Sequence, residues 1–113
     1  MNRKDWILSY YERFFNRHDV SAAEEYVQET YRQHNPGLAD GRRALMEGFS
    51  AKFREEPDFH LEVQLVLEDG DYLAVFAKNV GADSRVKCRV VDLYRLEGGK
   101  LAEHWDILQP CGI

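Results

Sequence analysis

The chain has 113 residues, 44% of them hydrophobic and 12% aromatic, and its 15 Lys and Arg against 20 Asp and Glu give a formal net charge of -5. This composition predicts a single globular domain over residues 1–113 and argues against nucleic acid or an anionic membrane as a partner. Two cysteines, Cys88 and Cys111, are too few for a disulfide framework. Without a recognisable signal peptide or an apolar run of membrane-spanning length, the sequence predicts a cytoplasmic protein.

The first third of the chain is predicted to be helical. Aromatic and aliphatic residues recur there at helical spacing, at Trp6, Ile7, Tyr10, Tyr11, Phe14 and Phe15. Ser21 and Glu24 have the spacing of a capping box, which predicts a second, short helix. The residues expected on its inner face are Ala22, Ala23, Tyr26 and Val27.

A break and a third helix follow. The sequence Asn35-Pro36-Gly37 cannot continue a helix, because proline lacks the backbone N–H and restricts the residue before it. Asp40 is expected to cap a third helix that ends before Pro57. The residues expected on its inner face are Leu45, Met46, Phe49 and Phe53.

After Pro57 the hydrophobic period changes to two, which is typical of strands. Alternate residues of the first such run are apolar: Phe59, Leu61, Val63, Leu65 and Leu67. Turn residues at 69–71, 81–83 and 98–99 separate this run from three more strands, at 72–80, 85–96 and 101–109. Helices followed by an antiparallel meander predict an α+β fold with the helices on one face of a curved sheet.

The last two predicted strands carry ionisable side chains among apolar ones. Asp92 shares its parity with apolar neighbours on both sides, so a carboxylate is expected on the inner face of the sheet. A carboxylate in such a place must be paired, protonated or exposed to a cavity. In the final strand, His104 and Asp106 face one way and Trp105 the other.

Two segments and the order of elements resemble a known family. Tyr-Arg-Gln-His-Asn-Pro at 31–36 and Glu-His-Trp-Asp-Ile-Leu-Gln-Pro at 103–110, after three helices and a sheet, resemble the SnoaL-like branch of the NTF2-like superfamily. The resemblance implies a cone in which helices and a mostly antiparallel sheet enclose a hydrophobic pocket. Its members include polyketide cyclases and ketosteroid isomerase, and they are commonly homodimers.

The resemblance also implies roles for individual residues. Asp106 corresponds to the late acidic residue that acts as general base in the cyclases, and His34, His104 and Asp92 are expected to assist it. Residues expected to bind substrate are Tyr31, Gln33, Asn35, Phe76, Trp105 and Gln109. No metal or organic cofactor is expected, because the histidines lack zinc spacing and no phosphate-binding loop is present.

The function implied is a cofactor-independent cyclase or isomerase that removes a proton next to a carbonyl group of a small hydrophobic ligand. One alternative is a non-catalytic ligand-binding or dimerisation module, because related sequences often carry a histidine in the strand at 74–78 and this chain has none. Another is epoxide hydrolysis by Asp92, Asp106 and Arg89. A third is a protein-interaction scaffold built on the sheet.

Two local alternatives also remain at this stage. Asp92 can instead form a structural ion pair with Arg89 or Arg95. A one-residue bulge in the last strand would move the position of Asp106 to Gln109, which cannot act as a base.

Overall fold

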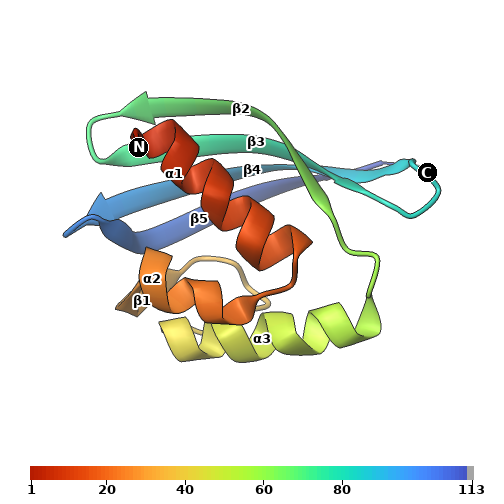
Figure 1. The fold of residues 1–113 in the computed structure, drawn as a ribbon, viewed down its shortest axis with the longest axis horizontal. Helices are drawn as coiled ribbons and strands as arrows, with labels where there is room; N and C mark the ends of the chain where they lie inside the picture. The colour runs from red at the N-terminus through yellow and green to blue at the C-terminus, as the bar shows by residue number, and fades with distance from the viewer. Residues whose placement is uncertain (112–113) are drawn as a thin grey trace.

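Helices cover one face of a five-stranded sheet in the computed structural model, which describes residues 1–111 (Figure 1). The helical elements are α1 (Arg3–Tyr10), the π-helical turn η1 (Tyr11–Asn16), the 3-10 turn η2 (Val20–Ala22), α2 (Ala23–Tyr26) and α3 (Arg42–Glu55). The strands are β1 (Val27–Gln33), β2 (Leu61–Asp69), β3 (Tyr72–Val80), β4 (Val86–Glu97) and β5 (Lys100–Pro110). None of the described helices is long and apolar enough to cross a membrane.

The aromatic stripe of the first helix is buried, as its spacing predicted. Asn2 caps α1 by accepting a hydrogen bond from the backbone N–H of Asp5. The chain then widens into the π-helical turn η1. Such turns are rare in proteins, and those that occur are often at functional sites. The wider turn leaves Tyr10, Tyr11 and Phe14 all less than 2% exposed.

The caps predicted for the next two helices are wrong. Ser21 donates its hydroxyl hydrogen to Asp19 rather than capping a helix, and the segment begins as a 3-10 turn. Asp40 accepts a hydrogen bond from the backbone N–H of Gln33, 2.6 Å away, so it fixes β1 and does not cap α3. The residue that precedes α3 is Gly41, whose φ of 99° suits glycine because other residues are strained there.

The sheet has one strand more than the sequence predicted. Residues 27–33, expected to hold the end of a helix and a break, form β1, which pairs parallel with β5. The strand order is β1-β5-β4-β3-β2, and all other pairs are antiparallel. The fold is therefore α+β with a mixed sheet, and it confirms the expected cone of helices on a mostly antiparallel sheet.

Strand boundaries in the second half agree closely with the predicted ones, but β2 contains a bulge. The bulge lies between Val63 and Leu65 and reverses the predicted alternation, so Leu65 and Leu67 are about half exposed on the outer face. The turn between β4 and β5 consists of Gly98 and Gly99, both with positive φ, as a two-residue hairpin requires.

Register in β4 and β5 decides which side chains meet inside the cone. Asp92 is opposite Asp106, and Tyr94 is opposite His104. The pairing is regular from Cys88 to Arg95, so no bulge moves Gln109 into the place of Asp106. Asp92 faces inward as its parity predicted, and the residue is only 5% exposed.

Candidate active site

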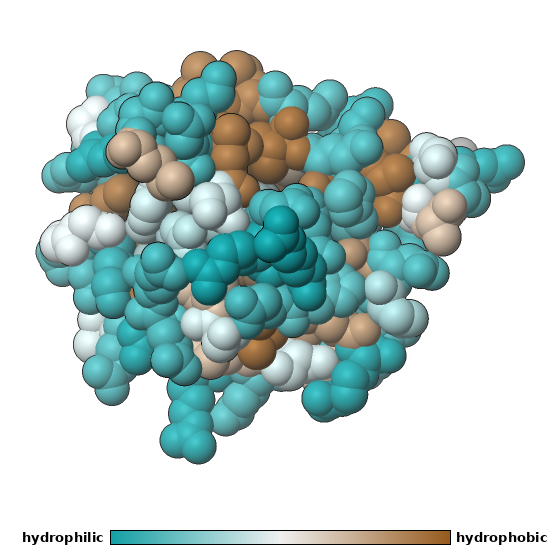
Figure 2. All heavy atoms as spheres, in the orientation of Figure 1, coloured by the Kyte–Doolittle hydropathy of each residue, from teal (hydrophilic) through white to brown (hydrophobic). Residues whose placement is uncertain are grey.

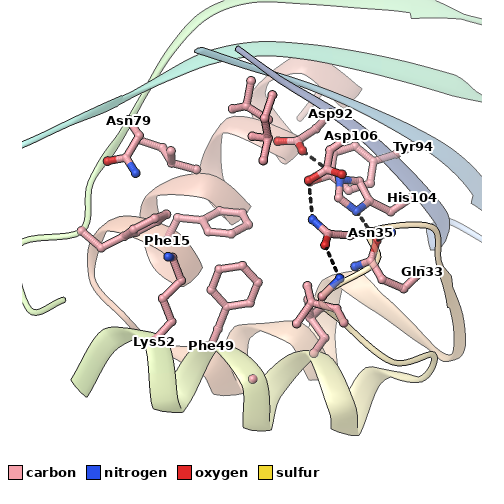
Figure 3. Close-up of a pocket in the computed structure, with 18 of the residues that line it drawn as sticks. Phe15, Gln33, Asn35, Phe49, Lys52, Asn79, Asp92, Tyr94, His104 and Asp106 are labelled. Atoms are coloured by element: carbon pink, nitrogen blue, oxygen red, sulfur yellow. Dashed lines mark hydrogen bonds and ion pairs between the residues drawn. The ribbon is translucent and has the colours of Figure 1, made fainter. Parts of the chain in front are cut away.

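A cavity of about 290 Å³ lies between the sheet, the first helix and α3. Its walls are mainly aromatic and aliphatic, and a polar cluster occupies one end (Figure 3). Six of the ten residues predicted for the site line this cavity: Asp92, His104, Asp106, Tyr31, Gln33 and Asn35. Concave, mostly apolar sites with a few convergent polar groups are typical of small-molecule binding.

Strand register brings the polar cluster together from three neighbouring strands. Asp92 on β4 lies opposite Asp106 on β5, while the parallel pairing of β1 with β5 places Gln33 beside His104. The predicted pairing of strands lacked β1, so the sequence offered no reason for Gln33 to meet His104. The extra strand therefore supplies half of the contacts made by the histidine.

His104 is held by hydrogen bonds at both ring nitrogens. Nε2 lies 2.8 Å from Oδ1 of Asp92, and Nδ1 lies 2.7 Å from Oε1 of Gln33. The same Gln33 oxygen accepts from the backbone N–H of Asn35, at 3.3 Å. A backbone N–H can only donate, which identifies this atom as the amide oxygen and requires a proton on Nδ1 of His104.

The proton on Nδ1 constrains the buried pair of Asp92 and His104. Because His104 donates to Gln33 from Nδ1, its Nε2 shares one further proton with the Asp92 carboxyl group. The pair is either imidazolium with carboxylate or imidazole with carboxylic acid, and both forms have no net charge. With Asp92 5% and His104 7% exposed, a neutral pair avoids the large cost of burying a single charge.

Tyrosines surround the pair on its buried side. The hydroxyl of Tyr11 donates to Oδ2 of Asp92 and lies 2.8 Å from the hydroxyl of Tyr94. The ring of Tyr94 stacks on His104 with 4.7 Å between centroids. Burial, with the charge of Asp92 second, holds the pKa of Tyr11 and of Tyr94 well above the usual range, so both remain proton donors at neutral pH.

Asp106 is oriented by Asn35. The Asn35 side-chain amide donates to Oδ2 of Asp106 at 2.8 Å, and its oxygen accepts from the backbone N–H of Gly37 at 2.9 Å. That second bond fixes which end of the amide faces Asp106. Among the described residues nothing is bonded to Oδ1 of Asp106, which leaves this oxygen available to a ligand in the cavity.

Asp92, His104 and Asp106 are also the group that could hold a metal ion. Each offers one ligand atom, and these atoms all lie within 4.8 Å of one another. His104 already donates from Nδ1 to the Gln33 amide oxygen, as metal-ligating histidines commonly donate from the nitrogen that does not bind the metal. Binding through Nε2 would require loss of the hydrogen bond from His104 to Asp92.

Four of the predicted site residues lie outside the cavity. His34 projects to the outer face, where its ring stacks on Trp105 at 4.7 Å between centroids and its Nε2 lies 2.7 Å from Glu103. Phe76 and Gln109 are also on the outer face, because their parity is opposite to that of the inward residues of β3 and β5. Trp105 is on the outer face as well, because its parity in β5 is opposite to that of His104 and Asp106.

The arginines of the alternative predictions do not reach Asp92. Arg95 pairs with Glu103 at 3.0 Å, and Arg89 donates to the sulfur of Cys111 at 3.2 Å. Both side chains are on the face of β4 opposite to Asp92. The structural ion pair is therefore absent, and two carboxylates and an arginine do not converge as epoxide hydrolysis would require.

Some cavity residues were not predicted. Tyr94 has the same parity as Asp92, and Lys52 follows Leu45 and Phe49 on the inner stripe of α3, so both could have been found from spacing. The role of Tyr11 could not have been found from spacing, because Tyr11 and Asp92, which are hydrogen-bonded, are 81 positions apart in the sequence. Asn79 faces the cavity from β3, on the same parity as buried Val75 and Ala77.

Comparisons with known proteins identify the family and the fold. The family model described as SnoaL-like polyketide cyclase matches residues 6–113. No curated protein sequence gives a match. Among solved structures, TsrD from Streptomyces laurentii is similar at 17% identity, with a TM-score of 0.78 over 96% of this chain and 90% of that one.

Two further solved structures have the same fold. IdmH from Streptomyces antibioticus, a candidate polyketide cyclase, is 20% identical, with a TM-score of 0.74 over 96% of this chain and 92% of its own. A SnoaL-like protein of unknown function from Burkholderia thailandensis is 13% identical, with a TM-score of 0.77 over 96% and 98%. At these identities the likeness establishes the fold.

Proposed function

Because the chain belongs to the SnoaL-like polyketide cyclase family, we propose that it is a cyclase or isomerase that removes a proton next to a carbonyl group without a cofactor. One observation carries the proposal: Asp106, oriented by Asn35, presents to an apolar cavity a carboxylate oxygen to which no described residue is hydrogen-bonded. A carboxylate held in a fixed orientation at the wall of a cavity is placed to act as a general base toward a ligand there.

In the proposed reaction the Asp106 carboxylate takes a proton from a carbon flanked by carbonyl groups and becomes a carboxylic acid, while the substrate becomes an enolate. In a cyclase the enolate carbon then forms a bond to a second carbonyl carbon of the same molecule. The resulting alkoxide recovers the proton from Asp106. In an isomerase the proton returns instead to another carbon of the enolate.

Tyr31 is the proposed donor to the enolate oxygen. It lines the cavity, and the described residues form no hydrogen bond to its hydroxyl. Burial is the main cause that raises its pKa well above the usual range, with the charges of Asp92 and Asp106 contributing. The hydroxyl therefore stays protonated, and a fixed donor near the developing charge stabilises the enolate.

The Asp92–His104 pair supports the base without replacing it. Asp92 and His104 are hydrogen-bonded to each other. His104 is also hydrogen-bonded to Gln33, and Asp92 to Tyr11. Of the two carboxyl groups in the cluster, Asp106 is the one with an oxygen to which no described residue is hydrogen-bonded. We assign the pair the role of positioning Gln33 and Asn35, which in turn orient Asp106.

Hydrogen exchange into a ketone tests the base. Wild-type protein is expected to accelerate deuterium incorporation at the acidic carbon of 2-tetralone in D2O, and Asp106→Asn should reduce this rate by about 10²–10⁴-fold. Asp71→Asn, at an exposed turn, is the matched control and should behave as wild type. NMR gives the rates, and circular dichroism checks the fold of each variant.

Either of two results would contradict the proposal. Unchanged exchange in Asp106→Asn would show that another group is the base. Binding of 2-tetralone by wild-type protein with no acceleration of exchange would favour the non-catalytic ligand-binding module instead.

A homodimer is the second part of the proposal. Two apolar rows cross the outer face of the sheet, and strand register defines them: Leu65, Phe76, Val91 and Ile107 in one, and Leu67, Ala74, Leu93 and Trp105 in the other. Ile107 is 73% exposed and Leu65 48%. Neighbouring exposed apolar side chains on one face of a sheet are typical of interaction sites, and a second copy of the chain is the commonest partner.

A further inference from the structure

Lys52 lies at the end of the cavity away from the polar cluster (Figure 3). It continues the inward stripe of α3, on which Leu45, Gly48 and Phe49 also line the cavity. The side of α3 that lines the cavity is therefore apolar except at Lys52, its last lining position, which carries a positive charge. Among the residues that line the cavity, Lys52 is the one lysine or arginine.

Two contacts fix the ammonium group. Nζ of Lys52 lies 2.7 Å from Oε2 of Glu56, the residue that follows α3, and 5.2 Å from the centroid of the Phe59 ring. A lysine ammonium has three N–H donors, and Glu56 uses one. The side chain of Lys52 is 40% exposed, so its remaining donors can reach a ligand at the mouth of the cavity.

Other groups at this end suit an anion. The Asn79 amide comes from β3 on the same side of the cavity as Lys52 (Figure 3). Cys88, the partner of Asn79 in the sheet, also lines the cavity. The Lys52 ammonium, paired with Glu56, and the Asn79 amide thus lie at one end of the cavity, and Asp92 and Asp106 lie at the other.

We propose that the natural ligand is a flat ring compound that carries a carboxylate, with this group at Lys52 and Asn79 and its acidic carbon at Asp106. The inference rests on the proposed function, because Asp106 sets the orientation. The protein has a net charge of -5, so a local cation is needed to hold an anionic ligand against the general repulsion. At about 290 Å³ the cavity is at the lower limit of small-molecule sites, which favours one or two rings.

A pair of probes of equal shape tests the charge. 2-Naphthoate and 2-naphthamide differ by one negative charge, and their affinities are measured by calorimetry at low salt. Wild-type protein is expected to bind 2-naphthoate at least about fivefold more tightly than 2-naphthamide. Lys52→Gln should remove this preference, because the lysine charge is what distinguishes the two probes.

Two other variants make the test specific. Glu56→Gln removes the competing carboxylate from Lys52, so it should increase the affinity for 2-naphthoate. Lys78→Gln is the matched control, because it removes an equal charge from a lysine–glutamate pair on the outer face, 3.5 Å from Glu62. This variant should keep the preference of the wild-type protein.

The outcomes separate this inference from the proposed function. Equal affinity of wild-type protein for the two probes, or a preference that survives Lys52→Gln, would overturn the anionic ligand while the cavity and its base stand. Failure of wild-type protein to bind either probe would overturn the cavity as a site for flat ring compounds, and with it the proposed function.

Discussion

Glu103 shows how a charged residue on the outer face of the sheet is stabilised by its neighbours. Its carboxylate lies 2.7 Å from Nε2 of His34 and 3.0 Å from Nε of Arg95, with Arg32 at 3.9 Å. The His34 hydrogen bond, followed by that of Arg95, holds the pKa of Glu103 below its ordinary value of 4.5. The residue is 8% exposed.

This lowered pKa predicts acid-sensitive stability. A carboxyl group whose pKa is lower in the folded than in the unfolded chain stabilises the fold above about pH 4.5, and this contribution is lost as the pH falls through the folded pKa. Glu103→Gln should therefore reduce the free energy of unfolding at pH 7, and its difference from wild type should shrink below pH 4.5. Urea denaturation over the pH range measures both curves.

Glu62→Gln is the control for this prediction, because Glu62 pairs with Lys78 at 3.5 Å in an exposed position. It should change the free energy of unfolding by less than about 1 kcal/mol. A difference between Glu103→Gln and wild type that stays constant into acid would show that the loss comes from packing rather than from charge.

Single residues of the site were predictable where strand parity decided their direction. Asp92, His104 and Asp106 all point inward as their positions in alternating strands predicted. Parity does not say what a side chain will meet, however. The contacts of His104 with Gln33 and of Asp92 with Tyr11 bridge 71 and 81 positions, and no local pattern encodes them.

At the scale of elements, β1 is the main feature that the sequence did not predict. Only Val27 and Tyr31 are buried in this strand, and the polar residues between them do not alternate. β1 is at the edge of the sheet and pairs only with β5. Because its own hydrophobic pattern is weak, pairing with β5 rather than local sequence determines that it forms a strand. β1 nevertheless carries Tyr31 and Gln33 into the cavity, which makes it essential to the site.

Two irregular elements also shape the site. The π-helical turn η1 directs Tyr11 to Asp92 and Phe15 to the cavity wall. The bulge in β2 keeps Val63 and Val66 against the core while it exposes Leu65. Bulges and π-turns insert a residue into a regular strand or helix. A prediction that assumes a constant period therefore misses both.

For the whole molecule, the cone has two distinct faces with separate proposed roles. The inner face of the sheet holds the cavity, and the outer face holds the apolar rows. On the view of Figure 2, hydrophobic side chains reach the surface near β2 and towards the far end of the sheet, among hydrophilic ones. A dimer through the outer face would leave the cavity between sheet and helices uncovered.

The dimer predicts a response to one charged substitution. Ile107→Glu places a carboxylate in the apolar row at a position that is 73% exposed, so the fold should tolerate it while the association is lost. Sedimentation velocity is expected to give a dimer for wild type and a monomer for Ile107→Glu. Arg43→Glu on α3, whose side chain is 92% exposed, should remain a dimer. A monomeric wild-type protein would contradict this part of the account.

In the proposed function one positioned carboxylate, Asp106, removes a proton from a ring ketone held in the cavity. The most direct measurement is the stereochemistry of deuterium incorporation into 4-methyl-2-tetralone, whose ring stereocentre makes the two hydrogens on the acidic carbon distinguishable by NMR. A base fixed on one side of the ligand predicts that the protein exchanges one of these hydrogens much faster than the other. Exchange of both at equal rates, or at the rate of buffer alone, would contradict the claim.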